Sequence, residues 1–241
     1  MRRTARISGT VLVIAGVGVL AWTVAVWRWQ DPFTGLYTHY EQHRLSHSLD
    51  KEFAAYAAPK RTRAREAVAS EERHLASAAE RFRRNAREGQ AIGRIIVPRL
   101  GLNMVLVNGT DHDTLKKGPG RDPRTFMPGE GQLVYIAGHR TTYLAPFSHI
   151  DALRRGDRVT LEMPYATFVY RVTGHRIVPA DDLAVLRSHG LEQVALQACH
   201  PRFFATHRYI AYASAVRVIP RVGRPYTPRN GFGRATRLTP A

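Results

Sequence analysis

An uncharged stretch near the start of the chain places the tightest limit on its fold. From Ile7 to Trp27 there is no charged side chain, a run of 21 residues. A helix rises ~1.5 Å per residue, so this run spans roughly 30 Å, the thickness of the hydrocarbon region of a bilayer. Arg2, Arg3 and Arg6 precede it. Because basic residues stay on the cytoplasmic side, the sequence predicts a single-pass type II protein of the cell membrane, with everything after Trp27 outside the cell.

A cleaved signal peptide is the alternative interpretation, since it also begins with basic residues and an apolar stretch. Its apolar region usually has only about 7–15 residues and ends in small residues. Here the stretch is longer and ends in the bulky segment Trp27-Arg28-Trp29. Indole rings favour the membrane–water interface. Residues 1–30 are therefore predicted to be a cytoplasmic tip and transmembrane anchor, with membrane lipid as a partner.

The chain is strongly basic, with 36 Lys and Arg against 19 Asp and Glu and a formal net charge of +17. Such a balance often indicates a nucleic-acid partner, because phosphate neutralisation dominates that affinity. The predicted membrane span argues against it, because the bulk of the chain would lie away from cytoplasmic DNA and RNA. Anionic lipids and anionic wall polymers are the simpler partners for the basic surface.

Helical spacing of apolar residues follows the anchor. The first apolar face consists of Leu45, Leu49, Phe53 and Tyr56, and a thinner, Ala-rich face follows Pro59 over residues 64–86. We expect residues 31–89 to form a helical juxtamembrane spacer that holds the next domain off the bilayer. A coiled-coil contact with another chain is the alternative.

Short β-type runs separated by Gly and Pro clusters begin at residue 92. These runs cover residues 95–97, 104–107, 133–137, 159–161, 168–172, 194–196 and 209–218. Many short strands at this density are typical of an all-β barrel or sandwich, here predicted for residues 90–219. Two short helices are expected near residues 111–116 and 146–153. Residues 220–241 are rich in Pro, Gly and Arg and are predicted to be a flexible basic tail.

Three candidate reactive side chains lie at the ends of predicted strands: His139 after Ala137-Gly138, the only cysteine, Cys199, and Arg208, which follows it by nine residues. A lone cysteine cannot form a disulfide within its domain, so it is either buried or kept for its reactivity. If the last two strands pair, Cys199 and Arg208 point into the same cleft.

The three residue types suit nucleophilic catalysis. A thiolate is a strong nucleophile, an imidazole moves protons near neutral pH, and a guanidinium can hold a carbonyl oxygen or an oxyanion. The chain offers rivals for the histidine and the arginine. They are His112, His149, His175, His200, His207 and Arg202. His200 is disfavoured because consecutive side chains on a strand point apart.

From about Ile92 to Val218 the chain resembles the sortase family of cysteine transpeptidases, most closely its actinobacterial class E branch. The segments that carry the resemblance are 93–98, 115–120, 128–132, Ile136-Ala137-Gly138-His139-Arg140, 156–157, Cys199-His200-Pro201 and Arg208. The resemblance implies a closed eight-stranded β-barrel with short helices, and His139, Cys199 and Arg208 as catalytic residues.

Two substrate-binding positions also follow from the resemblance. Thr141-Thr142-Tyr143 is similar to a class E pattern, which implies Tyr143 in the substrate groove. Ala198 occupies the place of the Thr that usually precedes the family's catalytic cysteine. This departure removes one hydroxyl beside the nucleophile.

The resemblance further implies an activity: cleavage between Thr and Gly of a Leu-Pro-x-Thr-Gly or Leu-Ala-x-Thr-Gly sorting motif in exported proteins. The acyl group would pass to an amine of a cell-wall precursor or a pilin. The chemistry calls for no cofactor and no metal. Two alternatives stay open: a cysteine peptidase that uses water as acceptor, and a non-catalytic wall-binding barrel.

Overall fold

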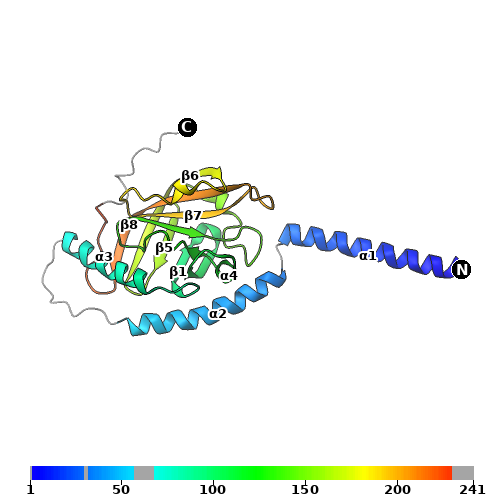
Figure 1. The fold of residues 1–241 in the computed structure, drawn as a ribbon, viewed down its shortest axis with the longest axis horizontal. Helices are drawn as coiled ribbons and strands as arrows, with labels where there is room; N and C mark the ends of the chain where they lie inside the picture. The colour runs from blue at the N-terminus through cyan, green and yellow to red at the C-terminus, as the bar shows by residue number, and fades with distance from the viewer. Residues whose placement is uncertain (1, 30–31, 57–67, 230–241) are drawn as a thin grey trace.

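Eight strands close into one barrel in the order β1-β2-β3-β4-β7-β8-β6-β5. Figure 1 shows this barrel with the N-terminal helix extending away from it. The computed structural model describes residues 2–29, 32–56 and 68–229. The strands are β1 (Ala91–Val97), β2 (Leu102–Asn108), β3 (Gly120–Arg121), β4 (Leu133–Ala137), β5 (Arg158–Glu162), β6 (Ala166–Pro179), β7 (Gln193–His200) and β8 (His207–Pro220). The predicted closed eight-stranded barrel is confirmed.

Helices precede and interrupt the barrel. The α-helices are α1 (Arg2–Trp29), α2 (Pro32–Ala55), α3 (Val68–Asn85) and α4 (His112–Leu115). Three 3-10 helices lie between strands: η1 (Pro98–Leu100), η2 (Ile150–Ala152) and η3 (Leu183–Leu186). Both predicted short helices are present as α4 and η2, whereas η1 and η3 had no clear signal in the sequence.

Side chains along each strand alternate between the two faces of the sheet, so an apolar layer forms on each face. Side chains such as Ile95, Leu106, Ile136 and Phe168 fill the barrel and are fully buried. A smaller cluster lies on the opposite face of β4, β7 and β8, where residues of η3 partly cover it. Its buried members are Leu133, Tyr135, Val178, Ala195, Ile210 and Tyr212. The sheet is thus buried on both faces where these strands meet.

The shortest strand, β3, was missed in the sequence, where its region was interpreted as turn punctuation. It has two residues, Gly120 and Arg121, which pair with β2 on one side and β4 on the other. A side chain at Gly120 would collide with the backbone oxygen of Gly109. Glycine is therefore required for a close strand contact here, although the same residue usually indicates a turn.

The two helices of the predicted spacer share apolar cores with the barrel. Leu45 and Leu49 of α2 are buried against Val105 and Val107 of β2. The side chain of Gln42 also brackets Val105, accepting from its backbone nitrogen at 2.6 Å and donating to its carbonyl at 3.1 Å. In α3, Leu75 and Ala79 belong to the main barrel core. These helices pack on the barrel because their apolar faces have no other partner in the described residues.

The first helix differs from the rest. Its segment Arg6–Val24 is long and apolar enough to cross a membrane, with a hydropathy of 2.0 and none of it buried in the structure. A long apolar helix whose apolar segment is not buried against the rest of the structure is consistent with a membrane anchor.

At the other terminus, the first residues of the predicted tail make defined contacts. Tyr226 exchanges two backbone hydrogen bonds with Val218 of β8, at 2.8 and 3.0 Å. Arg229 donates its backbone nitrogen to Glu72 of α3 at 2.8 Å. The remainder of the predicted tail, residues 230–241, lies outside the described residues.

Candidate active site

The ends of three adjacent strands bring the predicted catalytic residues to one level of the barrel. Strand β4 runs parallel to β7, and Ala137 is paired with Gln197. His139 lies two residues beyond Ala137, as Cys199 lies two residues beyond Gln197, so the two side chains start from the same level of the barrel. On the other side of β7, Cys199 is the direct partner of Arg208 in β8. Neighbouring strands lie ~4.8 Å apart. Nucleophile, imidazole and guanidinium candidates therefore lie in a row with Cys199 in the middle.

Gly138 explains why His139 leaves the strand where it does. Its backbone nitrogen still donates to Gln197 at 3.0 Å, continuing the ladder by one bond. An added Cβ at this position would lie 2.6 Å from the buried ring of Phe147. Phe147 in turn donates its backbone nitrogen to the carbonyl of His139 at 3.1 Å. Glycine lets this ring pack beneath the turn that presents His139.

The imidazole of His139 is partly buried. Burial lowers its pKa below the usual value, and the nearby His112 adds to the shift in the same direction. Its Nε2 is shielded from solvent and has no hydrogen-bond partner within the described residues. The neutral imidazole is therefore the favoured form near neutral pH, and it can accept a proton.

Cys199 is half-buried on β7 and carries a free thiol. Alternation along β7 separates its side chain from that of Ala198, which is fully buried in the barrel core. The methyl group of Ala198 therefore lies on the opposite face of the strand from the thiol, and any contact of this residue with a ligand would come from its backbone. Cys199 faces the same side as Ala195 of the second apolar cluster.

Arg208 is held by its own loop. Its Nη1 donates to the carbonyls of Ala205 at 2.8 Å and His207 at 3.0 Å. Within the described part of the chain, its Nε and Nη2 have no protein acceptor. A guanidinium fixed at one corner keeps its other donors available for a carbonyl oxygen or an oxyanion.

Tyr143 connects this site to the start of α2. Its ring centroid lies 5.0 Å from that of His139, and 6.5 Å from that of Tyr37 in an edge-on contact. Its backbone nitrogen donates to the hydroxyl of Thr34 at 2.9 Å. Sequence reasoning missed Thr34 and Tyr37, since a contact across more than 100 residues leaves no local signal.

The rival residues have other surroundings. His175 stacks on Tyr209 with centroids 4.9 Å apart, and His207 contacts the hydroxyl of Thr206. His149 contacts the hydroxyl of Ser148, and His112 lies in α4. Arg202 lies in the loop before β8, with its Nε buried and without a partner in the described residues. The register that aligns Cys199 favours His139 and Arg208 over these residues.

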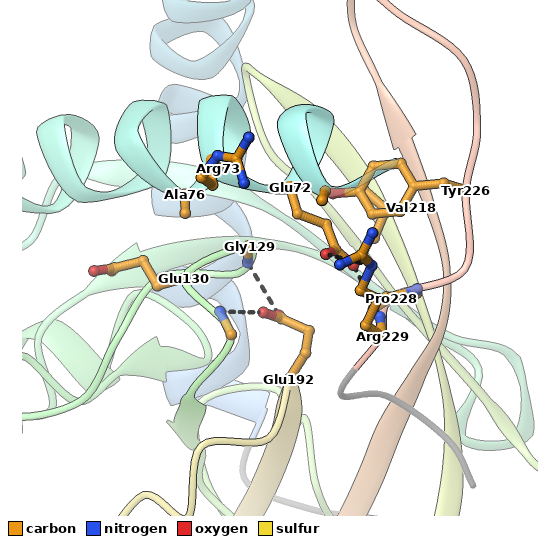
Figure 2. A pocket seen from close by; sticks show the side chains of 12 residues that line it. Glu72, Arg73, Ala76, Gly129, Glu130, Glu192, Val218, Tyr226, Pro228 and Arg229 are labelled. Carbon is orange, nitrogen blue, oxygen red and sulfur yellow. Dashed lines mark hydrogen bonds and ion pairs between the residues drawn. The ribbon is translucent and has the colours of Figure 1, made fainter. Parts of the chain in front are cut away.

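A separate cavity lies at the other end of the barrel (Figure 2). It has a volume of about 400 Å³ and is lined by α3, the turn at residues 129–131 and the segment that ends at Arg229. Glu192, which precedes β7, is buried beneath it and accepts from the backbone nitrogens of Gly129 and Gly131 and from the hydroxyl of Tyr170. Seven residues of extended strand, roughly 23 Å, separate Glu192 from Cys199. This cavity is therefore distinct from the candidate active site.

Metal-ligating side chains do not cluster among the described residues. Among the residues that the structure describes, no group of three or more His, Cys, Asp or Glu side chains could hold a metal ion.

These features define a closed eight-stranded β-barrel protein with a free cysteine at the end of β7. A model of the sortase domain family matches residues 95–216, about half of the chain. The chain belongs to the sortase family.

Individual relatives agree with this assignment. Sortase D of Bacillus subtilis (strain 168) is 33% identical over 132 residues, which are 53% of this chain and 65% of that protein. The match thus spans slightly less than two thirds of that relative. The SrtA sortase from Actinomyces oris is 29% identical, with a TM-score of 0.53, over 61% of this chain and 91% of that chain.

The fold alone is shared with more distant structures. A Clostridium perfringens Sortase D5 transpeptidase has a TM-score of 0.58 at 22% identity, over 73% of this chain and 99% of that chain. Similar proteins carry the class letters A, C, D, E and F. The family is therefore established, whereas the predicted class E membership is not confirmed.

Proposed function

We propose that this chain is a membrane-anchored cysteine transpeptidase with Cys199 as its nucleophile. The observation that carries the proposal is that Cys199 on β7 is paired with Arg208 on β8, while His139 follows the end of β4, the strand on the other side of β7. Membership of the sortase family supports the same reaction class.

The first half of the reaction forms a thioester. The neutral imidazole of His139 takes the thiol proton, and the Cys199 sulfur bonds to the carbonyl carbon of the substrate's Thr. Donors of Arg208 stabilise the resulting oxyanion, an effect worth about 10²–10³ in rate where one such donor has been removed. The tetrahedral intermediate then expels the Gly amine, which receives the proton from His139.

The second half transfers the acyl group. An acceptor amine attacks the thioester carbon and gives its proton to His139. The carbon–sulfur bond breaks, and the leaving sulfur takes the proton back from His139, which restores the Cys199 thiol and the neutral imidazole. The lowered pKa of His139 suits this cycle, because an imidazolium that loses its proton readily is a good general acid.

The proposed substrate is a Leu-Pro-x-Thr-Gly or Leu-Ala-x-Thr-Gly motif of an exported protein, and the proposed acceptor is an amine of a cell-wall precursor or a pilin. Tyr143 would form a wall of the motif groove, since its ring lies beside His139. The Leu-Ala-x-Thr-Gly preference and class E membership rest on the segment Thr141-Thr142-Tyr143.

The proposed location is the outer face of the cell membrane, with residues 1–30 as the anchor and residues 90–219 as the catalytic barrel. Thr34, which binds the backbone of Tyr143, follows Trp29 by only five residues. A chain extends at most about 3.5 Å per residue, so that contact lies within about 18 Å of the end of α1. Tethering enzyme and substrate to one membrane raises their effective concentration.

A Leu-Ala-x-Thr-Gly peptide incubated with the full chain in detergent, with and without an added amine, tests the proposal. We expect the amide transfer product to dominate when the amine is present, and Cys199→Ala to form neither product. If the free acid dominates in both cases, the chain is a cysteine peptidase. The same test is repeated with a Leu-Pro-x-Thr-Gly peptide. If neither peptide gives a transfer product or a free acid, the enzymatic proposal is wrong, and a non-catalytic wall-binding barrel takes its place.

A further inference from the structure

Arg140, the residue after His139, reaches across to the strand that carries Cys199. Its side chain is only 4% exposed. Its Nη1 donates to the carbonyl oxygen of Cys199 at 3.1 Å and contacts Nδ1 of His200 at 3.0 Å. Its Nη2 forms an ion pair with Asp151 of η2 at 2.9 Å. One buried guanidinium thus joins the turn that presents His139, the end of β7 and η2.

These contacts continue the pairing of β4 with β7. The last backbone bond runs from the Gly138 nitrogen to the Gln197 carbonyl at 3.0 Å. Acceptors in a parallel ladder recur every second residue, so the next acceptor on β7 is the carbonyl of Cys199. The side chain of Arg140 donates to that oxygen. The ladder is therefore extended to the nucleophile by a side chain.

The contact with His200 lies on the opposite face of β7 from the thiol. Ala198 points into the barrel core, and alternation places Cys199 on the opposite face and His200 on the face of Ala198. The ring of His200 lies 6.2 Å from that of Tyr209, a core residue. Arg140 therefore contacts the residue that follows the nucleophile on the side of the strand away from the thiol.

The chemistry of the pair fixes its protonation pattern. A guanidinium only donates, so Nδ1 of His200 accepts and the proton of the neutral ring is on Nε2. Asp151 offsets the buried charge of Arg140, which would otherwise be costly. The Nδ1 of His200 is thus occupied by the contact with Arg140.

We propose that Arg140 is a positioning residue that sets the spacing between His139 and Cys199, with the acceptor nitrogen of His200 and the carboxylate of Asp151 holding its guanidinium in place. The inference rests on the proposed function, because the spacing matters only if imidazole and thiol exchange a proton. A displacement of about 1 Å in such a site can cost on the order of 100-fold in rate.

A matched pair of substitutions at His200 tests the inference. Asn places an amide oxygen near the position of Nδ1 and can accept from Arg140, whereas Leu has the same shape without an acceptor. We expect His200→Asn to keep kcat within about threefold of the parent, and His200→Leu to lower it roughly tenfold or more with KM little changed. Equal kcat values for the two variants, whether both normal or both low, would overturn the inference.

A second measurement does not depend on peptide transfer. The rate of Cys199 alkylation by iodoacetamide is compared between the parent and His139→Ala, and again in an Arg140→Gln background. We expect His139→Ala to change the alkylation rate of Cys199 about fivefold when Arg140 is present. In the Arg140→Gln background, we expect the same substitution to change this rate less than about twofold. Equal ratios in the two backgrounds would overturn the inference.

The two measurements separate the failures. If the parent chain transfers no peptide but the alkylation ratios differ, the proposed function fails and the positioning role stands. Thermal unfolding of each variant identifies any loss of fold, and where Arg140→Gln is unfolded, the His200→Asn and His200→Leu backgrounds replace it in the alkylation comparison.

Discussion

The two ends of the barrel differ in how completely their buried polar groups are hydrogen-bonded. At the end of Glu192, a buried carboxylate accepts from two backbone nitrogens and one hydroxyl. At the end of Cys199, His139 and Arg202 each keep a buried nitrogen without a partner in the described residues. All the non-glycine residues with positive φ in the described chain also lie in two loops at this end. They are Tyr143, Leu144, Ala145, Phe203 and Ala205.

This difference separates a structural end from a reactive one. Strained backbone and unpaired polar atoms lower stability, so they persist where the rest of the fold supports them. Saturated polar groups hold elements together but offer no free donor or acceptor to a ligand. Substitutions at the Cys199 end should therefore act on rate, and substitutions at the Glu192 end should act on stability.

Removal of the nucleophile should have the largest effect. Cys199→Ala is expected to lower transfer by at least roughly 10⁴-fold, because removal of a catalytic nucleophile elsewhere costs this much or more. Its thermal unfolding should stay close to that of the parent, since the substitution removes a single half-buried sulfur atom. Product analysis by mass spectrometry, paired with a melting curve, checks both. Measurable transfer by Cys199→Ala would contradict the assignment.

Loss of the guanidinium beside Cys199 should rank next. Arg208→Gln is expected to lower kcat about 10²–10³-fold, since it removes charged donors aimed at the oxyanion. Arg202→Gln, in the loop before β8, is the matched control and should retain most activity. Steady-state kinetics with a motif peptide compares them. A larger loss for Arg202→Gln would exchange their roles.

The pH dependence of stability tests the opposite end. Burial raises the pKa of Glu192 to about 7, against its ordinary 4.5. The folded state therefore binds this proton more tightly than the unfolded state, so the stabilisation is full below pH 4.5 and is lost as pH rises through 7. The difference of 2.5 pKa units corresponds to about 3 kcal/mol.

We expect the free energy of unfolding of the parent to fall by up to about 3 kcal/mol between pH 4.5 and 8, and Glu192→Gln to lose this dependence. Glu72→Gln, on the rim of the same cavity, is the control and should retain it. Urea titrations across this pH range measure the effect. Equal slopes for parent and Glu192→Gln would show that Glu192 is not the titrating group.

The smallest effect concerns the contact between α2 and the site. Thr34→Val leaves the Tyr143 backbone nitrogen without its acceptor, at a cost of about 1 kcal/mol. If the loop position matters, kcat/KM should fall roughly fivefold, and Thr34→Ser, which keeps the hydroxyl, should restore it. Indistinguishable kinetics for Thr34→Val and Thr34→Ser would show that the Thr34 hydroxyl does not affect the site.

Most of the barrel was predictable because each long strand has a local apolar pattern. Leu133–Ala137 was predicted with its observed bounds, and the nine-residue spacing from Cys199 to Arg208 correctly indicated paired strands. In contrast, the two-residue strand at Gly120 has no pattern of its own and exists only through its neighbours. In the sequence, Gly120 belongs to a Gly- and Pro-containing cluster that indicates a turn.

The site was predictable in part for the same reason. Cys199 and Arg208 are linked by a short loop, whereas His139 comes from a parallel strand some sixty residues away, so its proximity rested on resemblance alone. The roles proposed for Thr34 and Arg140 depend on contacts made through side chains after the chain has closed. No periodicity or spacing encodes such contacts.

Mass spectrometry of the digested protein after rapid quenching tests the central claim most directly. The full chain is mixed with a Leu-Ala-x-Thr-Gly peptide without acceptor, quenched in acid and digested. The account predicts an added acyl mass, lacking the Gly leaving group, on the peptide that contains Cys199. An unmodified Cys199 peptide while the substrate is being cleaved would contradict it.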